Sequence, residues 1–480
     1  MSTANHAVSL GAARPGELEV SPHRWSILYA VLAANVMGPI DGSVISVALP
    51  TFSRVFHVGL NTVGWVSMAY LLVLGSLILT YGRLGDMFGF KRIFLLGVAL
   101  FTAASAVCAL APDIWTLIAF RAVQAIGAGM FMAMAPAIIA ATFPAGERGR
   151  ALGLFGMTAA VGLSLGPSLG GLLLSVSSWQ SIFLINLPVG VIGYLLCSRT
   201  LPDQTELKRQ RFDLVGAAAG FVSLGSLLLA GSYGEEWGWS STPTVGLAAA
   251  FLVTSAAFIW WERRVTQPML ELSLFRNLAF SAACFSSLMN FVSQSALVFL
   301  VPFYLQQILA WTPKQTGLIM TVSPLVVLVV VPFSGSLSDR IGTRWLSFVG
   351  QALMAVGFVL LYRLTPTAGA FDIAWRIGVV GLGVGIFQSP NNSTIMGNCP
   401  RHLLGTGSGV LATVRTAGMV LGVAVSTGVF EWRRSAMAVT LGPAGSYLSG
   451  LRLAFLVAAC LAAVGALTSS VRSDDWRNAG

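Results

Sequence analysis

The chain has 480 residues, of which 55% are hydrophobic and only 10% are charged, and its mean hydropathy is +0.79. Because an ordinary soluble domain is about one quarter charged, this composition argues against a cytosolic enzyme and excludes a disordered protein. The formal net charge of +10 does not indicate a nucleic-acid partner, since the basic residues lie singly or in pairs between apolar runs, as topology-setting charges do. We therefore expect a polytopic membrane protein that is not an enzyme.

Fourteen apolar stretches are long enough to cross a bilayer, for which about 20 residues are needed. They run from about 25–50, 62–81, 92–111, 114–142, 151–174, 179–198, 213–231, 244–261, 279–303, 316–334, 344–362, 374–396, 403–430 and 449–470. If the spans alternate in direction, most of the 28 Lys and Arg residues fall on the side of the N-terminus. Both termini are therefore predicted to be cytoplasmic, with the chain in the cell (inner) membrane.

The polar links between the spans predict the domain organisation. The longest link, residues 199–212, follows the sixth span, and two spans then precede the last six. The expected fold class is an all-α polytopic membrane protein with fourteen helices grouped as six, two and six. The predicted segments are a cytoplasmic tail (1–24), a six-helix bundle (25–200), two inserted helices with their linkers (201–270), a second six-helix bundle (271–472) and a cytoplasmic tail (473–480).

A loop motif occurs twice, after the second span and after the tenth, with a glycine four residues before an aspartate and another three residues after it. Glycine permits a tight turn, and an aspartate at a helix N-terminus can hold an arginine across the mouth of the protein. Plain positive-inside charge is the alternative interpretation. The residues predicted to form this cytoplasmic gate loop are Gly82, Asp86, Gly89, Arg92, Asp339 and Arg344.

The first copy of the motif, GRLGDMFGFKR from Gly82, resembles the conserved loop of the major facilitator superfamily. Residues 121–129 resemble that family's helix 4 motif, and residues 162–171 resemble the helix 5 motif of its proton-coupled exporters. Residues 41–50 and 179–188 are similar to its fourteen-helix drug:proton antiporter branch (multidrug efflux type). The resemblance extends from the first span to the last and implies the major facilitator fold, alternating access and proton coupling.

The fifth predicted span is rich in glycine. Small residues let helices approach closely and a proline kinks a helix, so this pattern predicts a seam that opens and shuts between the two halves. Helix packing alone is the alternative. The predicted hinge residues are Gly162, Gly166, Pro167, Gly170 and Gly171. The sequence departs from the family's helix 4 motif at Ala125 and from the stretches typical of the branch at Ser43, Ser46 and Gln180. These departures bear on what the resemblance implies about substrate specificity more than on what it implies about fold.

Asp41 is the only acid that lies well inside a predicted span. An ionised, unpaired carboxyl in hydrocarbon costs several kcal/mol, so we expect it to be functional, and the resemblance implies a coupling role for this position. Asp41 and Arg121 lie about 13 Å and about 12 Å from the same end of their helices at a rise of 1.5 Å per residue. We predict that Asp41, Arg121 and Gln124 carry proton coupling; a structural ion pair is the alternative.

Polar and aromatic side chains inside the spans are candidates for a substrate cavity, because transporter sites lie near the midplane between the two halves. Amides there are costly unless they are paired, and aromatic rings can hold a bulky apolar cation. For Arg415, snorkelling or packing is the leading alternative. The candidate cavity residues are Trp65, Asn290, Gln294, Asn391 and Arg415.

Together these features predict a proton-coupled secondary antiporter that exports lipophilic or cationic drugs by alternating access. We expect a monomer whose partners are small-molecule substrates, protons and the bilayer, with no metal and no cofactor besides the proton. An exporter of a lipid or endogenous metabolite is the first alternative. A nutrient importer is disfavoured by the glycine pattern of the fifth span. A membrane enzyme or passive channel would need paired carboxylates, histidine clusters or a filter-like loop, which the sequence lacks.

Overall fold

The computed structural model describes residues 23–202, 213–238, 240–265, 272–399 and 404–470, and every regular element in these ranges is a helix. The first group comprises α1 (Arg24–Asn35), α2 (Met37–Val55), α3 (Leu60–Phe88), α4 (Phe90–Ala109), α5 (Ile114–Thr142), α6 (Ala145–Val176), α7 (Ser181–Leu184) and α8 (Asn186–Thr200). Two helices follow, α9 (Leu214–Trp237) and α10 (Thr242–Glu262). The last group comprises η1 (Leu272–Arg276), α11 (Leu278–Phe303), η2 (Tyr304–Ile308), α12 (Pro313–Met320), α13 (Val322–Ile341), α14 (Thr343–Tyr362), α15 (Ala370–Gly397) and α16 (Leu404–Ser470).

Eleven helices in these ranges are long and apolar enough to cross a membrane, which confirms an all-α membrane protein. The apolar stretches Leu60–Gly75 in α3 and Ala218–Leu227 in α9 are shorter. The 67 residues of α16 contain a non-helical Gly442 followed by Pro443, so this element consists of two helices joined at a kink. The predicted number of fourteen spans stays a prediction.

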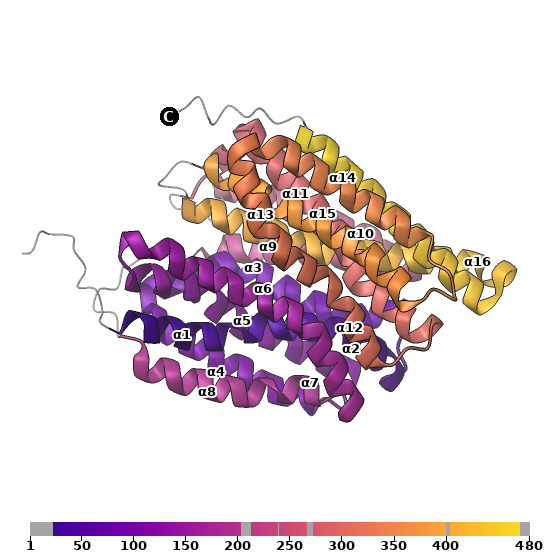
Figure 1. Cartoon of the computed structure of the whole chain (residues 1–480), viewed down its shortest axis with the longest axis horizontal. Coiled ribbons are helices and arrows are strands. Elements are labelled where there is room, and N and C mark those ends of the chain that lie inside the picture. The colour runs from indigo at the N-terminus through magenta and orange to yellow at the C-terminus, as the bar shows by residue number, and fades with distance from the viewer. Residues whose placement is uncertain (1–22, 203–212, 239, 266–271, 400–403, 471–480) are drawn as a thin grey trace, which may run out of the picture.

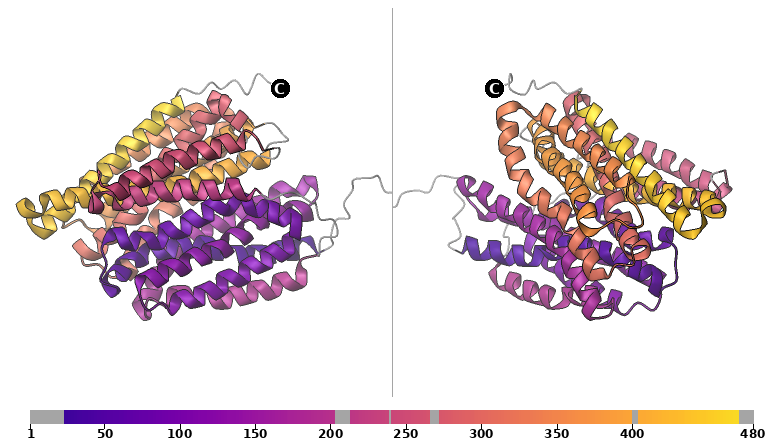
Figure 2. Two further views of the ribbon diagram at one scale, coloured as in Figure 1. Left: turned by 180° about the vertical axis from the view of Figure 1, so that it is seen from behind. Right: turned by 45° about the vertical axis from the view of Figure 1, so that its right-hand side comes forward.

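The helices form two bundles that lie one on the other, purple and orange to yellow in Figure 1. The same pairs pack in each bundle: α2 against α6 and α11 against α16, α4 against α5 and α14 against α15, and α3 against α5 and α13 against α15. This repeat is typical of transporters built from duplicated units. Helix α10 packs on α9, and α9 contacts α3 of one bundle and α16 of the other. The views in Figure 2 show the same two layers from behind and after a turn of 45° about the vertical axis.

The helices alternate in direction, so each end of the molecule collects a defined set of loops (Figure 1). We call the end that carries Arg24, Gly89 and Ser470 the terminal end, and the end that carries Asp113 and Gly442 the distal end. At the distal end α12 reaches the first bundle and packs against α6 and α2.

Two single glycines connect neighbouring helices at the terminal end, and both belong to the duplicated loop motif. Gly89 joins α3 to α4 with a φ of 92°, and Gly342 joins α13 to α14 with a φ of 94°. Residues with a side chain rarely adopt this backbone conformation, whereas glycine does so readily. The glycine three residues after each aspartate is therefore explained by the turn that it makes.

Replacing either turn glycine by alanine is expected to lower the free energy of unfolding by about 1–3 kcal/mol, because the new side chain would be held in a strained region of φ and ψ. Gly59→Ala is the matched control, since Gly59 has a φ of −73° and open space where a Cβ would lie. Thermal unfolding of the purified protein measures the effect. Equal melting temperatures for Gly89→Ala and Gly59→Ala would contradict the prediction.

Asp113 caps the helix that carries Arg121 and Gln124. Its Oδ1 accepts hydrogen bonds from the backbone amides of Trp115 at 2.8 Å and Thr116 at 2.9 Å, and its Oδ2 accepts one from the Thr116 hydroxyl at 2.7 Å. The hydrogen bond from the Thr116 amide is the main reason why the pKa of this carboxyl lies below its ordinary value. The ionised form is the better cap for a helix N-terminus.

A lowered pKa in the folded state means that ionised Asp113 stabilises the fold above the ordinary value of 3.8 and loses this effect as the pH falls through the lowered pKa. We expect the melting temperature of Asp113→Ala to lie below that of the wild type at pH 7, and the two to converge in acid. Asp113→Asn is the control, because the amide oxygen still accepts a hydrogen bond but does not titrate. A difference between wild type and Asp113→Ala that is independent of pH would contradict this account.

Candidate functional site

Asp41 and Arg121 form an ion pair inside the first bundle. The distance from Arg121 Nη1 in α5 to Asp41 Oδ2 in α2 is 2.6 Å, and the two side chains are 1% and 0% exposed. Arg121 Nη1 also donates to Gln124 Oε1, and Gln124 Nε2 donates to Asp41 Oδ1 at 3.2 Å. The contact expected from equal depth is therefore present, both directly and through Gln124. Its role in coupling stays a proposal.

Two further helices complete this cluster. Asn186, at the start of α8, donates from Nδ2 to Asp41 Oδ1 at 3.0 Å. Ser105 of α4 accepts from Gln124 Nε2 at 2.7 Å. Neither residue is among those predicted for the site, although Asn186 is the only amide in its helix. Such an isolated polar residue in an apolar helix is the signal that could have identified it.

The Arg121 guanidinium is held on its other side by α3. Its Nε donates to the Val66 carbonyl at 3.3 Å, and its Cζ lies 4.1 Å from the centre of the Tyr70 ring, a cation–π distance. Five helices thus enclose the pair, and neither side chain is reached by solvent in this conformation. Proton exchange at Asp41 therefore requires the helices around it to move.

The Asp41 carboxyl is held by several donors. Arg121, Gln124 and Asn186 all donate to its two oxygens and occupy three of the roughly four acceptor sites that a carboxylate offers. A buried pair is stable only when hydrogen bonds satisfy both charges, and removing one partner costs about 3–5 kcal/mol. Loss of either charge is therefore expected to disturb the packing of the helices that hold the pair.

The second bundle has a neutral counterpart. Asn290 of α11 donates to Gln351 Oε1 of α14 at 3.5 Å and contacts Met354 Sδ at 3.3 Å, while Gln351 Nε2 donates to the Ser286 carbonyl at 2.9 Å. These side chains are buried, and none of them is charged. Only the first bundle has an ion pair in its interior among the described residues.

The other candidate cavity residues occupy different environments. Trp65 is 8% exposed and stacks on Tyr233 of α9, with ring centres 6.2 Å apart, so it packs against an inserted helix. Asn391 in α15 is fully buried, as is Asn290, whereas Gln294 is partly exposed. Arg415 alone of the five is exposed. Most of the set is thus packed between helices in this conformation, and its assignment to a cavity stays a prediction.

The predicted gate loop is described only in part. Gly82 lies within α3, and the side chains of Asp86 and Asp339 lie outside the described part of the structure. Arg92 is exposed, and Arg344 is partly buried with its guanidinium 5.4 Å from the centre of the Trp345 ring. The aspartate–arginine contact across the terminal end stays a prediction.

The predicted hinge glycines of α6 face two different helices. A Cβ on Gly162, Gly166 or Gly170 would meet α2, and one on Gly171 would collide with the Pro313 carbonyl at the start of α12. Gly317 of α12 faces the carbonyl of Pro167 in return. Gly171 therefore lies where the two bundles cross, and its lack of a side chain permits that close approach.

Hydrogen bonds between the two bundles add to this crossing. Arg54 donates to Gln306 Oε1 at 3.3 Å, Gln306 Nε2 donates to the Val47 carbonyl at 2.9 Å, and the hydroxyls of Ser168 and Thr321 lie 2.6 Å apart. These hydrogen bonds lie at the distal end or at mid-depth. The bundles are thus closed together at the distal end.

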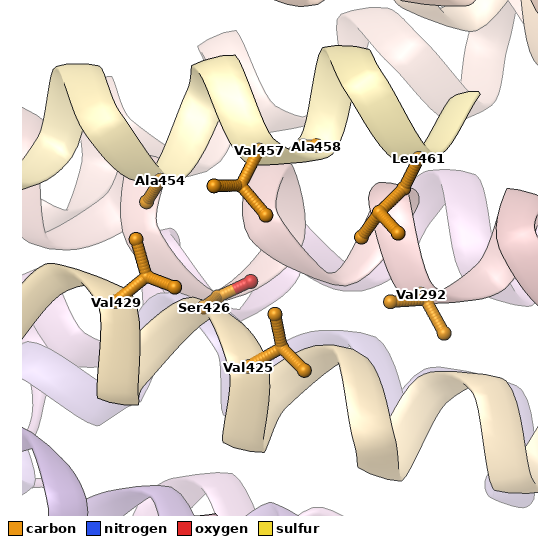
Figure 3. Close-up of a pocket in the computed structure, with 8 residues that line it drawn as sticks. All are labelled: Val292, Val425, Ser426, Val429, Ala454, Val457, Ala458 and Leu461. Atoms are coloured by element: carbon orange, nitrogen blue, oxygen red, sulfur yellow. The ribbon is translucent and has the colours of Figure 1, made fainter. Parts of the chain in front are cut away.

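Neither of the two cavities described here is a substrate-sized site between the bundles. A pocket of about 10 Å³ lies between α11 and the two arms of α16, lined by apolar side chains and Ser426 (Figure 3). It has room for about one water molecule, far below the 300–1,000 Å³ or so of a drug site. A hollow of about 540 Å³ lies on the outer surface of α10 beside Trp260 and Arg264.

Comparison with known proteins decides the family. The sequence matches the Major Facilitator Superfamily over residues 31–423, and again over residues 283–475. The chain belongs to this superfamily. The resemblance inferred from the loop motif is therefore confirmed at the level of the family. The prediction that the protein is a transporter rather than an enzyme is confirmed with it.

Relatives of the chain are named after different substrates. The chain is 33% identical to the riboflavin transporter RibZ of Clostridioides difficile over 85% of this chain and 88% of that protein. It is 33% identical to the multidrug resistance protein Stp of Mycobacterium tuberculosis over 80% of this chain and 72% of that protein. It is 29% identical to the tetracenomycin C resistance and export protein of Streptomyces glaucescens over 88% of this chain and 79% of that protein.

Solved structures of the Major Facilitator Superfamily share the fold. A bacterial homologue of the lysosomal transporter Spinster, in an inward-facing conformation, has a TM-score of 0.66 at 16% identity over 94% of this chain and 97% of that one. The inward-open xylose transporter XylE from E. coli has a TM-score of 0.62 at 14% identity over 93% of this chain and 95% of that one. These likenesses establish the architecture alone.

Proposed function

We propose that the protein is a proton-coupled antiporter that exports lipophilic compounds across the cell membrane. The observation that carries this proposal is the buried pair of Asp41 and Arg121, which can accept a proton only when the helices around it rearrange. Two relatives are named as a multidrug resistance protein and as a tetracenomycin C resistance and export protein, and these names support export as the direction of transport.

The proposal includes the finer architecture. Treating α1 with α2, α7 with α8, α11 with η2 and α12 with α13 as single spans, and α16 as two, gives the fourteen helices of the drug:proton antiporter branch. The excess of basic residues on the side of the N-terminus supports a cytoplasmic terminal end. The distal end then faces outward, and its closure corresponds to an inward-facing state.

In this scheme the two ends open in turn. The present state has a closed distal end and an Asp41 carboxylate held by three donors, as expected after a proton has left for the cytoplasm. Cargo binds from the terminal end, and the bundles rock apart at the crossing of α6 and α12. A proton then reaches Asp41 from outside as the cluster loosens, and cargo leaves. Return to the inward-facing state restores the ion pair and releases the proton.

Dye transport in inverted membrane vesicles tests the proposal. We expect energised vesicles that contain the protein to accumulate the neutral dye Nile red or the cation ethidium, and a protonophore to abolish this accumulation. Vesicles that carry Asp41→Asn are the matched control. Accumulation that persists in the presence of the protonophore would contradict proton coupling.

Export of an endogenous flavin-like metabolite is the second candidate function. The specific observation is the relative named as a riboflavin transporter, which is 33% identical over 85% of this chain. Labelled riboflavin in the same vesicles separates the two candidates. Protonophore-sensitive accumulation of riboflavin without accumulation of either dye would favour the metabolite.

A further inference from the structure

Arg415 lies at mid-depth beside the contact between the two bundles. Its neighbour Thr416 occupies the space where Gly75 of α3 would carry a Cβ. Gly75 lies near the middle of α3, which runs from Leu60 to Phe88. Arg415 is therefore close to the midplane and one residue from the seam between α3 and α16, the region where transporters of this architecture place their cargo.

The Arg415 side chain is both deep within the protein and exposed. It is densely surrounded by protein atoms, yet its side chain is exposed to solvent. A side chain on the outer, lipid-facing surface would lack protein on one side. The combination places the side chain at an accessible position inside the protein rather than on the lipid-facing surface.

No carboxylate balances this charge among the described residues. In the second bundle, Asp372 pairs with Arg376 at 2.8 Å and Glu431 with Arg434 at 3.1 Å, both towards the distal end. Asp41, which lies well inside its span, is committed to Arg121. The described contact of the Arg415 guanidinium is with the Phe291 ring, whose centre lies 5.6 Å away.

An unpaired guanidinium at this depth is costly, and such residues are retained where they meet water or a ligand. We propose that Arg415 binds a single anionic group on an aromatic cargo molecule, with the Phe291 ring beside it. The inference rests on the proposed export function and narrows its cargo to neutral or singly anionic aromatic compounds. Asp41 does not offer a free negative charge to a cationic cargo in this conformation, because Arg121 neutralises it.

Binding of three matched anthracenes tests the assignment. 9-Anthracenecarboxylate, 9-anthracenemethanol and 9-(aminomethyl)anthracene share one ring system and are negative, neutral and positive at pH 7. Equilibrium dialysis against the full chain in phosphatidylcholine nanodiscs, without any ion gradient, gives their dissociation constants. The variants are Arg415→Gln, Arg415→Lys and the control Arg363→Gln, which removes an exposed arginine at the distal end of α14.

We expect the wild type to bind the carboxylate at least about tenfold more tightly than the amine. Arg415→Gln should weaken binding of the carboxylate by about ten- to a hundredfold, as loss of a charged hydrogen bond does, and leave binding of the neutral alcohol unchanged. Arg415→Lys should retain part of the selectivity, and Arg363→Gln all of it. Unchanged binding of the alcohol also shows that the variant is folded.

Two results would overturn the assignment: equal affinity of the wild type for all three compounds, or an equal loss of all three in Arg415→Gln, which would indicate a packing role. Failure here is separable from failure of the proposed function. If Arg415 binds no anion, protonophore-sensitive transport of Nile red remains. If proton coupling is absent, charge-selective binding in nanodiscs remains.

Discussion

Replacing Asp41 by asparagine is expected to reduce proton-driven efflux by at least tenfold, because the amide cannot take up and release a proton. Substrate-induced proton release from purified protein, followed with a pH indicator, should disappear. The substitution also leaves Arg121 buried without a countercharge, so we expect the free energy of unfolding to fall by about 3–5 kcal/mol. Undiminished proton release from Asp41→Asn would remove this residue from the coupling mechanism.

Two control variants separate coupling from stability. Glu147→Gln removes the acid of the partly exposed pair with Arg24, whose atoms lie 2.9 Å apart, and should leave efflux and proton release unchanged. Ser105→Ala removes a hydrogen-bond acceptor from Gln124 without changing charge. It should lower stability by about 1 kcal/mol and retain proton release. Loss of proton release in Ser105→Ala would show that any disturbance of the cluster has the same effect as removing the acid.

Alanine at Gly171 or Gly317 is expected to hold the distal end open and to reduce efflux by about tenfold or more. Each new Cβ would collide with a backbone carbonyl of the facing helix, at Pro313 or Pro167. Neither backbone can yield as a flexible side chain can, so the closed arrangement becomes unfavourable. The expected outcome is a protein that is folded and trapped facing outward.

Spin labels at Thr51 in α2 and Lys314 in α12 measure the opening directly, since α2 and α12 meet at the distal end. In a cysteine-free background the distance distribution should shift to longer values in Gly171→Ala and Gly317→Ala. Gly156→Ala is the matched control, because Gly156 lies in the same helix with open space around a Cβ. If Gly171→Ala and Gly156→Ala give the same distribution, the crossing of α6 and α12 is not the element that closes the distal end.

The sequence sufficed for those features that depend on helix geometry alone. The rise per residue is fixed, so equal depth of Asp41 and Arg121 could be calculated without knowing how the helices pack. The turn at Gly89 could likewise be expected, because the duplicated spacing marks a position that only glycine fits. Composition alone was enough to identify a membrane protein.

Features that depend on how each helix is rotated could not be predicted. The sequence shows that Asn290 is polar within a span, but not that Gln351 on another helix satisfies it. Trp65 was expected in a cavity, and its partner proved to be Tyr233 of an inserted helix. Asn186 joins the ion pair through the packing of α8 on α4 and α1, which no local pattern encodes.

Proton coupling through Asp41 alone would limit the electrical work of a transport cycle. If one proton enters for each molecule expelled, a monovalent cation leaves with no net charge moved, and the membrane voltage does not contribute. A neutral molecule moves one charge inward, and a monovalent anion moves the equivalent of two. Each charge is worth about 2.3 kcal/mol per 100 mV. The membrane voltage therefore contributes nothing to the export of a monovalent cation, the energy of one charge to the export of a neutral molecule, and twice that energy to the export of a monovalent anion.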